Sequence, residues 1–182
     1  MANHLSSIPE QFQGACAGFL VDSYQAAVKA LAHGFGIQSS HQWASDEDFL
    51  EHLYSSPMAE ELALVSSAAA QAIDRGDKEL WGAVHDALNS LLASVSLPPG
   101  SEAIAYRVAE EYWKTAIGQM FALAKLWLDG DQLITISEAA RLQGVPLTTM
   151  AGRVNRGNIR SYPDPRAKHP QKAARLVVRA DL

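Results

Sequence analysis

The sequence predicts a mainly α-helical protein, in which a helical bundle over residues 1–130 precedes a small module over residues 131–182. Three observations lead to this prediction. Apolar residues recur at helical spacing through the first part, and short polar or Gly/Pro segments separate the helices. The second part holds two short helical patterns, each followed by a glycine, and then two alternating runs typical of a β-hairpin. The formal charge also changes sign near this boundary.

The net charge of −5 is the sum of two parts with opposite sign. Residues 132–182 contain nine Lys and Arg and three acidic residues, for a net charge of +6. Residues 1–131 contain six basic and 17 acidic residues, for a net charge of −11. A basic module joined to an acidic body is typical of nucleic-acid-binding proteins, so we expect double-stranded DNA as the partner.

A long first helix is predicted over residues 8–33, after a loose tail, and a short acidic helix over residues 45–54. Ser7 and Glu10 have the spacing of a capping box at the start of the long helix. Its apolar stripe includes Cys16, which we expect to be a buried structural thiol. A single cysteine excludes an intrachain disulfide, and no signal peptide or membrane-spanning run is found. We therefore expect a cytoplasmic protein.

Two further helices are predicted in the middle of the first part. One begins after Ser56 and reaches about Arg75, with Ile73 on its inward face. The other is capped by Asp77 and carries Trp81 on its inward face. Short connections between such helices are typical of a bundle.

The longest helix is predicted from Ser101 to about Leu128. Its second half is apolar on almost every side, which is more than one face of a monomer core requires. We therefore expect a homodimer formed through the amino-terminal helices, this one above all. The alternative is that the other four helices surround it within one chain. The side chains behind the expectation are Ile117, Met120, Phe121, Leu123, Leu126, Trp127 and Leu128.

The second part begins with an extended run that leads into two short helices. Ser137 is predicted to cap the first of these helices, and Gly144 to end it in a left-handed conformation. Pro146 opens the second helix, where its missing N–H costs nothing. Met150 and Val154 are four residues apart and share the inward face of that helix.

The end of the chain is predicted to form a β-hairpin. One strand covers residues 159–162 and is broken by Pro163, and the other covers residues 175–179. Residues 164–174 would form the tip between them. Two short helices followed by a hairpin make a winged helix-turn-helix, whose second helix can enter the major groove of DNA. Residues 129–131 are expected to form a tight hinge into this module.

The outward side of the second short helix is the predicted DNA-reading surface. Thr148 and Asn155 are expected to contact base edges, and the Arg and Lys side chains to contact phosphates. Gly152 has no side chain, so the backbone there can lie close to DNA. An ordinary helical hairpin with polar surface residues is the alternative. The predicted DNA-binding residues are Leu147, Thr148, Thr149, Gly152, Arg153, Asn155, Arg156, Arg160, Lys168 and Lys172.

Four short motifs follow one another in this part: Ser137–Ala140, Gly144–Val145, Arg156–Gly157 and Arg179–Leu182. In this order they resemble the helix-turn-helix domains of the excisionase and MerR-like superfamily, over about fifty residues. The sequence departs from that family at Ala151 and Gly152, where larger residues are usual, so the bases recognised need not be those of any relative. The resemblance implies DNA binding, without favouring recombination over transcription control.

Together these features predict a DNA-binding protein that acts as a dimer, either a sequence-specific transcriptional regulator or a phage- or plasmid-type accessory factor. The alternative is an architectural or DNA-maintenance protein that bridges duplexes with little sequence preference. We expect no enzyme activity, metal or cofactor, because no residues stand at the spacing of a catalytic or metal-binding motif. A small-molecule effector is not indicated, although Trp43, Trp81, Trp113 and Trp127 could line a pocket.

Overall fold

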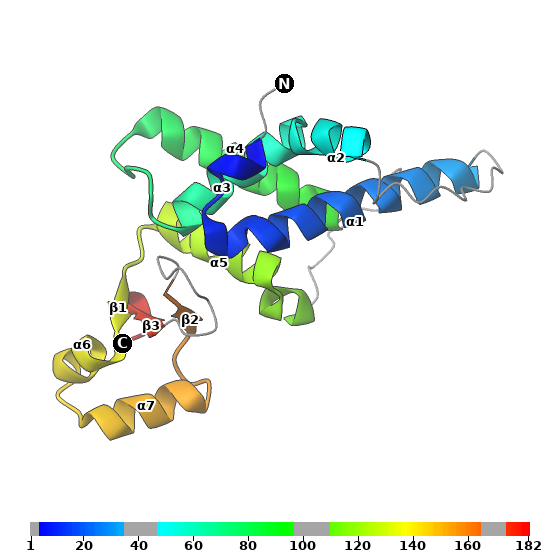
Figure 1. The fold of residues 1–182 in the computed structure, drawn as a ribbon. Coiled ribbons are helices and arrows are strands. Elements are labelled where there is room, and N and C mark those ends of the chain that lie inside the picture. The colour runs from blue at the N-terminus through cyan, green and yellow to red at the C-terminus, as the bar shows by residue number, and fades with distance from the viewer. Residues whose placement is uncertain (1–3, 35–46, 97–109, 165–173) are drawn as a thin grey trace.

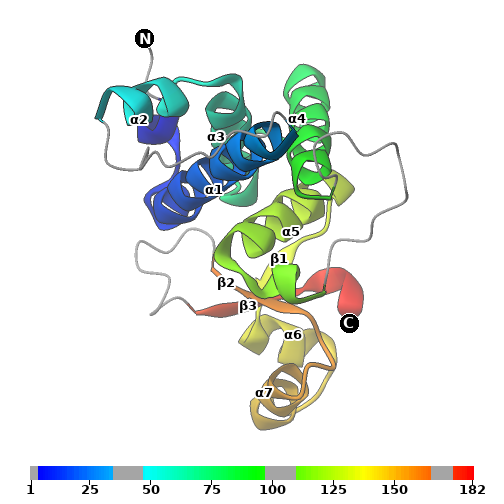
Figure 2. The same cartoon turned by 90° about the vertical axis from the view of Figure 1, so that its right-hand side faces the viewer.

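The computed structural model describes residues 4–34, 47–96, 110–164 and 174–182. In these ranges the chain is mainly helical, as the sequence predicts, and has a small antiparallel sheet near its carboxyl end. The sheet has three strands instead of the two of the predicted hairpin, because the extended run at residues 133–135 also pairs with the last strand. Figures 1 and 2 show the larger helices on one side of the sheet and two short helices on its other side. No helix within the described ranges is long and apolar enough to cross a membrane.

The helical body is built around one central helix. It comprises α1 (Glu10–Gly34), α2 (Glu47–Tyr54), α3 (Pro57–Ala69), α4 (Lys78–Ser96) and α5 (Ala116–Asp129), with the 3-10 helices η1 (His4–Ser7) and η3 (Glu110–Lys114). Helix α5 packs against α1, α3, α4 and η3. All of these helices contribute to one hydrophobic core, in which the Phe19 and Phe121 rings form a T-shaped pair with 5.9 Å between ring centroids.

The expectation that α5 has too much apolar surface for one chain is wrong. Its large apolar side chains from Met120 to Leu128 are all buried, and Met120 and Phe121 have no exposed surface. The neighbouring helices enclose α5 from several directions, because the chain folds back on it with α1, α3 and α4. The apolar surface of α5 from Met120 to Leu128 is therefore explained within one protomer, whereas Ile117 in the first turn is only half-buried.

The predicted long helix is interrupted at Thr115. Residues 97–109 lie outside the described ranges, and η3 precedes the break. Thr115 has an extended backbone (φ −71°, ψ 159°), and its hydroxyl accepts a hydrogen bond of 3.1 Å from the Gly118 N–H, so it is the N-cap of α5. The chain turns tightly here, and the longest described helix is α1, with 25 residues.

Helix α3 ends at Ala69, about six residues before the predicted end at Arg75. Gln71 adopts a left-handed conformation (φ 57°), the Gln71 N–H donates to the Ala68 carbonyl, and the Ala72 N–H donates to the Ser67 carbonyl. These two bonds form a Schellman motif, which usually has glycine at the left-handed position. Ile73 therefore lies beyond the helix instead of on its inward face.

The start of α4 is as predicted, whereas the orientation of Trp81 is not. The Asp77 carboxylate accepts hydrogen bonds from the Glu79 and Leu80 N–H groups and caps the helix. Trp81 is 39% exposed. Its indole N–H donates to the Leu128 carbonyl at 3.2 Å, and its ring stacks on His85. The indole covers the end of α5 from outside because its N–H needs a partner there.

The amino-terminal segment differs in part from the prediction. Residues 4–7 form η1 where a loose tail was expected, and the Ser7 hydroxyl donates to the His4 carbonyl instead of capping α1. Cys16 is buried as predicted, with its Sγ 3.6 Å from the Met120 Sδ. Burial raises the pKa of the Cys16 thiol to about 12, so it stays protonated at neutral pH.

The sheet is shared between two hydrophobic cores. Its strands are β1 (Leu133–Thr135), β2 (Ser161–Pro163) and β3 (Arg175–Val178), with β3 in the centre. Leu133, Tyr162 and Val178 pack against the core of the helical body. Ile134 and Val177, which point to the other face, belong to a second core with the two short helices. Both faces of the small sheet are thus covered.

The junction between α5 and β1 is tightly packed. Gly130 takes the left-handed conformation expected at a helix end (φ 77°). The Arg75 guanidinium lies directly against it, 2.0 Å from where a Cβ of residue 130 would be, and donates to the Leu128 carbonyl at 3.2 Å. A side chain at position 130 would strain the left-handed backbone and displace the Arg75 guanidinium. The segment predicted to be a hinge is thus held by a side chain from the α3–α4 connection.

Candidate nucleic-acid interface

Two short helices, α6 (Ile136–Leu142) and α7 (Leu147–Asn155), are joined by a turn at Gly144 (φ 63°), as predicted. The N-cap of α6 is Thr135 instead of Ser137, because its hydroxyl accepts the Glu138 N–H at 3.1 Å. Strand β1 leads directly into α6, so the last strand residue takes the capping position. Pro146 immediately precedes α7.

The inward face of α7 is formed by the predicted pair. Met150 is fully buried and Val154 is 5% exposed, in a core with Ala139 and Ala140 of α6. Residues on a helix are separated by about 100° around its axis. The opposite side therefore carries Thr148, Thr149, Asn155 and Arg156, all of which are exposed, with Gly152 near its centre.

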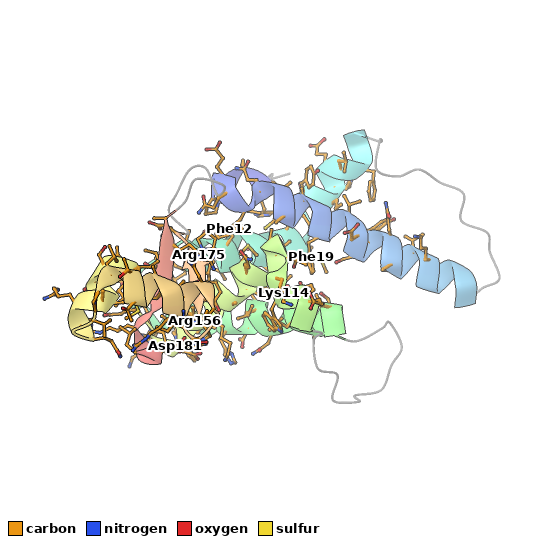
Figure 3. All side chains as sticks on the ribbon, turned by 90° about the horizontal axis from the view of Figure 1, so that it is seen from below. Phe12, Phe19, Lys114, Arg156, Arg175 and Asp181 are labelled. Atoms are coloured by element: carbon orange, nitrogen blue, oxygen red, sulfur yellow. The ribbon has the colours of Figure 1, made fainter. Side chains whose placement is uncertain are left out.

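The exposed side of α7 carries polar side chains, and at its middle Gly152 adds no side chain above the helix backbone. A Cβ added to Gly152 would lie 3.3 Å from the Arg156 Nη1, so the Arg156 side chain reaches back over this glycine. Arg156 is exposed, and Figure 3 labels it on α7. The helix backbone at Gly152 can therefore be approached closely once the flexible arginine moves aside.

The surroundings of α7 are basic. Residues 139–163 contain four arginines and no acidic residue. Arg141 and Arg156 are exposed, and Arg153 is half-buried and donates to the Gln143 Oε1 at 3.1 Å. The bond from Arg153 crosses from α7 to the end of α6, so this arginine also helps to fix the angle between the two helices. An anionic ligand would meet no carboxylate from this stretch of chain.

Arg160 forms a two-pronged ion pair that the sequence did not suggest. Its Nε lies 2.8 Å from the Asp181 Oδ2, and its Nη2 lies 2.7 Å from the Asp181 Oδ1. These hydrogen bonds raise the pKa of Arg160 and hold the pKa of Asp181 below its usual value. The pair joins the residue before β2 to the 3-10 helix η5 (Arg179–Asp181) and balances the charge of Arg160.

We expect Asp181→Asn to lower the free energy of unfolding by about 1 kcal/mol at pH 7. The folded-state pKa of Asp181 lies below its ordinary value of 3.8, so the pair stabilises fully above that value. The stabilisation is lost as the pH falls through the lowered folded-state pKa. Denaturant unfolding of the wild type and of Asp181→Asn should therefore show that their free energies of unfolding become more similar below about pH 4.

The control for this prediction is Glu111→Gln. Glu111 pairs with Lys114 at 2.7 Å, yet the two side chains are 80% and 62% exposed, so a change of only a few tenths of a kcal/mol is expected. The difference in the free energy of unfolding between Asp181→Asn and the wild type could also stay constant from pH 7 to strong acid. That result would contradict the assignment of this difference to the ion pair between Arg160 and Asp181.

The hairpin differs from the prediction at its first strand. Strand β2 starts at Ser161, and Ile159 is instead buried in the second core beside α7. Pro163 does not break the strand but ends it, paired with Arg175. Proline is tolerated because β2 is an edge strand, where one side needs no N–H donor. Lys168 and Lys172, like most of the predicted hairpin tip, lie outside the described residues.

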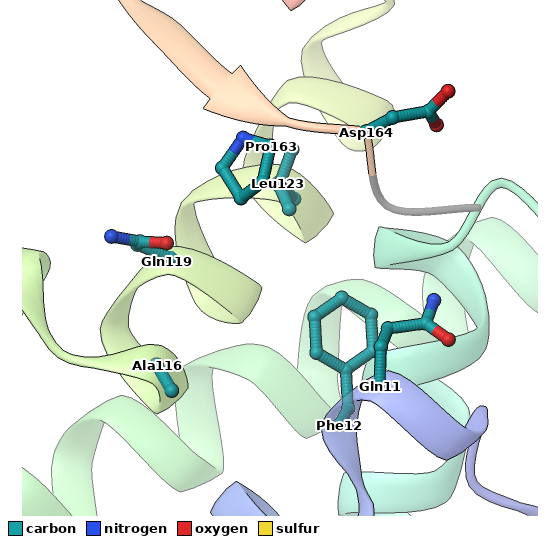
Figure 4. Close-up of a pocket in the computed structure, with 7 residues that line it drawn as sticks. All are labelled: Gln11, Phe12, Ala116, Gln119, Leu123, Pro163 and Asp164. Carbon is teal, nitrogen blue, oxygen red and sulfur yellow. The ribbon is translucent and has the colours of Figure 1, made fainter. Parts of the chain in front are cut away.

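A small pocket lies between the helical body and the end of β2 (Figure 4). Phe12 of α1, Ala116 and Leu123 of α5 and Pro163 give it a mainly apolar lining. Asp164 borders it with the carboxylate pointing away from Phe12. No tryptophan lines this pocket, and Trp81 and Trp127 border two separate surface depressions. Trp43 lies outside the described residues.

No group of three or more His, Cys, Asp or Glu side chains suited to a metal ion occurs in the described part of the chain. Comparisons with family models, with curated proteins and with solved structures find no match. We therefore assign no family, and the candidate interface rests on the geometry of α6, α7 and the sheet.

Proposed function

We propose that the chain binds double-stranded DNA through a winged helix-turn-helix formed by residues 131–182. In this proposal it acts as a sequence-specific transcriptional regulator or as a phage- or plasmid-type accessory factor. The observation that carries the proposal is the outer side of α7. Its exposed Thr148, Asn155 and Arg156 stand opposite the buried Met150 and Val154. Such side chains can donate to base edges and phosphates.

The position and the start of α7 support this proposal. In Figures 1 and 2, α7 is the element furthest from the helical body, so the body does not obstruct its outer side. The major groove is about 12 Å wide and admits an α-helix. No side chain caps α7 and no acidic residue lies in its first turn, so its N–H groups favour a phosphate there.

The proposal includes pairing of two chains, because one such module covers few base pairs and two-fold pairing suits palindromic sites. The buried residues of α5 from Met120 to Leu128 cannot supply the contact. We place it at an open groove between α1 and the first turn of α5, where Gly14, Gly18 and the half-buried Ile117 leave room for a helix of a second copy. Sedimentation at micromolar concentration tests the pairing, and a mass near 20 kDa without DNA, together with one chain per duplex in the complex, would exclude it.

Selection of duplexes from a random DNA pool tests the proposed function. Enrichment of a defined sequence, bound about 1,000-fold or more above random duplexes, is expected for a sequence-specific regulator. Tight binding without enrichment, and with a steep dependence on salt, would instead support the architectural alternative. Absence of binding at low salt would overturn the proposal.

Single substitutions then separate the two kinds of contact. Arg153→Ala and Arg156→Ala are expected to weaken binding to all duplexes and to reduce the salt slope by about one unit each. Thr148→Ala and Asn155→Ala are expected to change the selected sequence instead, at a cost of about 1–3 kcal/mol for the preferred base. An unchanged selected sequence would remove both residues as base contacts. Melting temperatures serve as the control for Arg153, whose bond to Gln143 also supports the fold.

A further inference from the structure

Large apolar side chains are rarely exposed among the residues that the structure describes. Trp81, Leu142 and Leu147 are the ones found in the described part of the chain. The exposure of Trp81 is explained by its stacking on His85 and its hydrogen bond to Leu128. Leu147 is the most exposed of the three, at 52%, and no hydrogen bond or ring contact accounts for its position.

Leu147 is the first residue of α7. Side chains of a helix incline toward its amino end, so Leu147 extends past the beginning of α7 and not over its middle. At about 100° per residue, Leu147 lies about 20° from Val154 and about 40° from Ala151, at the edge of the inward face, yet it is exposed in the first turn of α7. An exposed apolar group therefore lies at the amino end of α7, and this is the end at which base edges are usually contacted in helix-turn-helix proteins.

We propose that Leu147 recognises a thymine through the C5-methyl group, a specificity that rests on the proposed function. The thymine methyl is the apolar group that base pairs present in the major groove. The basic, carboxylate-free stretch around α7 matches the charge of DNA on either side of this contact. Leu147 thus supplies a preference for thymine that the hydroxyl, amide and guanidinium groups of α7 do not.

The test uses the full chain and the duplex enriched from a random pool, with each thymine replaced in turn by deoxyuridine. This replacement removes only the methyl group and keeps the base pairing. At one position of the duplex, we expect deoxyuridine to weaken binding of the wild-type protein about three- to fivefold. A change of this size corresponds to the loss of one buried methyl group. The same replacement should leave the affinity of Leu147→Ala unchanged.

Leu142→Ala is the matched control. Leu142 is 46% exposed and stands at the end of α6, so its truncation removes a similar apolar area beside the same turn. This variant should keep the full discrimination between thymine and deoxyuridine. Discrimination that persists in Leu147→Ala, or a wild type insensitive at every thymine, overturns the assignment while DNA binding stands. A pool with no enriched duplex overturns the proposed function and this specificity with it.

Discussion

Replacing Gly118 with alanine is expected to lower the free energy of unfolding by more than about 3 kcal/mol. A Cβ at this position would lie 2.1 Å from the Tyr112 carbonyl oxygen and 2.9 Å from the Trp113 Cα. Both are backbone atoms, so neither can rotate away as a side chain would. The turn at Thr115 would have to open, and η3 would separate from the first turn of α5.

Gly82→Ala on α4 is the matched control, because nothing lies within 4 Å of the Cβ that it adds. Alanine is the better helix former, so this variant should gain up to about 1 kcal/mol. Urea unfolding of the two variants and the wild type measures both effects. If Gly118→Ala were as stable as the wild type, the close packing of η3 on α5 would be refuted.

Replacing Gly152 with leucine is expected to reduce DNA affinity at least about 100-fold while the protein remains folded. Leucine would occupy the centre of the exposed side of α7 and hold the helix away from the groove. Contacts of Thr148, Asn155 and Arg156 would be lost together, and each is worth about 1–3 kcal/mol. The effect on folding has the opposite sign, because leucine favours a helix over glycine by nearly 1 kcal/mol.

The space around Gly152 permits this substitution. The nearest atom to its added Cβ is the end of the flexible Arg156 side chain, at 3.3 Å. Equilibrium unfolding should therefore show equal or greater stability, alongside the loss of binding in a titration with the enriched duplex. Gly82→Leu on α4 is the control and should leave DNA affinity unchanged. Wild-type affinity in Gly152→Leu would show that α7 does not approach DNA with this side.

The features of the interface that depend on local sequence could be predicted. Each of three features depends on residues within about one helical turn of it. These features are the turn at Gly144, the left-handed Gly157 after α7, and the burial of Met150 and Val154. Left-handed glycines and helical periodicity act at this range. The exposure of Thr148, Asn155 and Arg156 follows from the position of this inward pair, whereas Gly152 and Arg153 are half-buried.

Features that depend on distant contacts could not be predicted. The pair of Arg160 and Asp181 joins residues 21 positions apart, and no local pattern indicates it. The end of α3 was missed because Gln71, instead of a glycine, takes the left-handed conformation. The burial of α5 was misjudged because periodicity shows how many sides of a helix are apolar, but not how many neighbours the fold supplies to cover them.

The packing on both faces of the sheet also limits how two DNA half-sites could be spaced in the proposed complex. Leu133, Tyr162 and Val178 bind the sheet to the helical body, while Ile134 and Val177 bind it to α6 and α7. Swinging α7 relative to the body would expose one of these apolar sets to water. In a two-fold assembly, the separation and relative rotation of the two α7 helices would then be set by the fold and not by a linker. Such an assembly would bind two DNA half-sites only at one spacing, near a whole number of helical turns of DNA. A base pair inserted between the half-sites would rotate one of them away from its α7 helix.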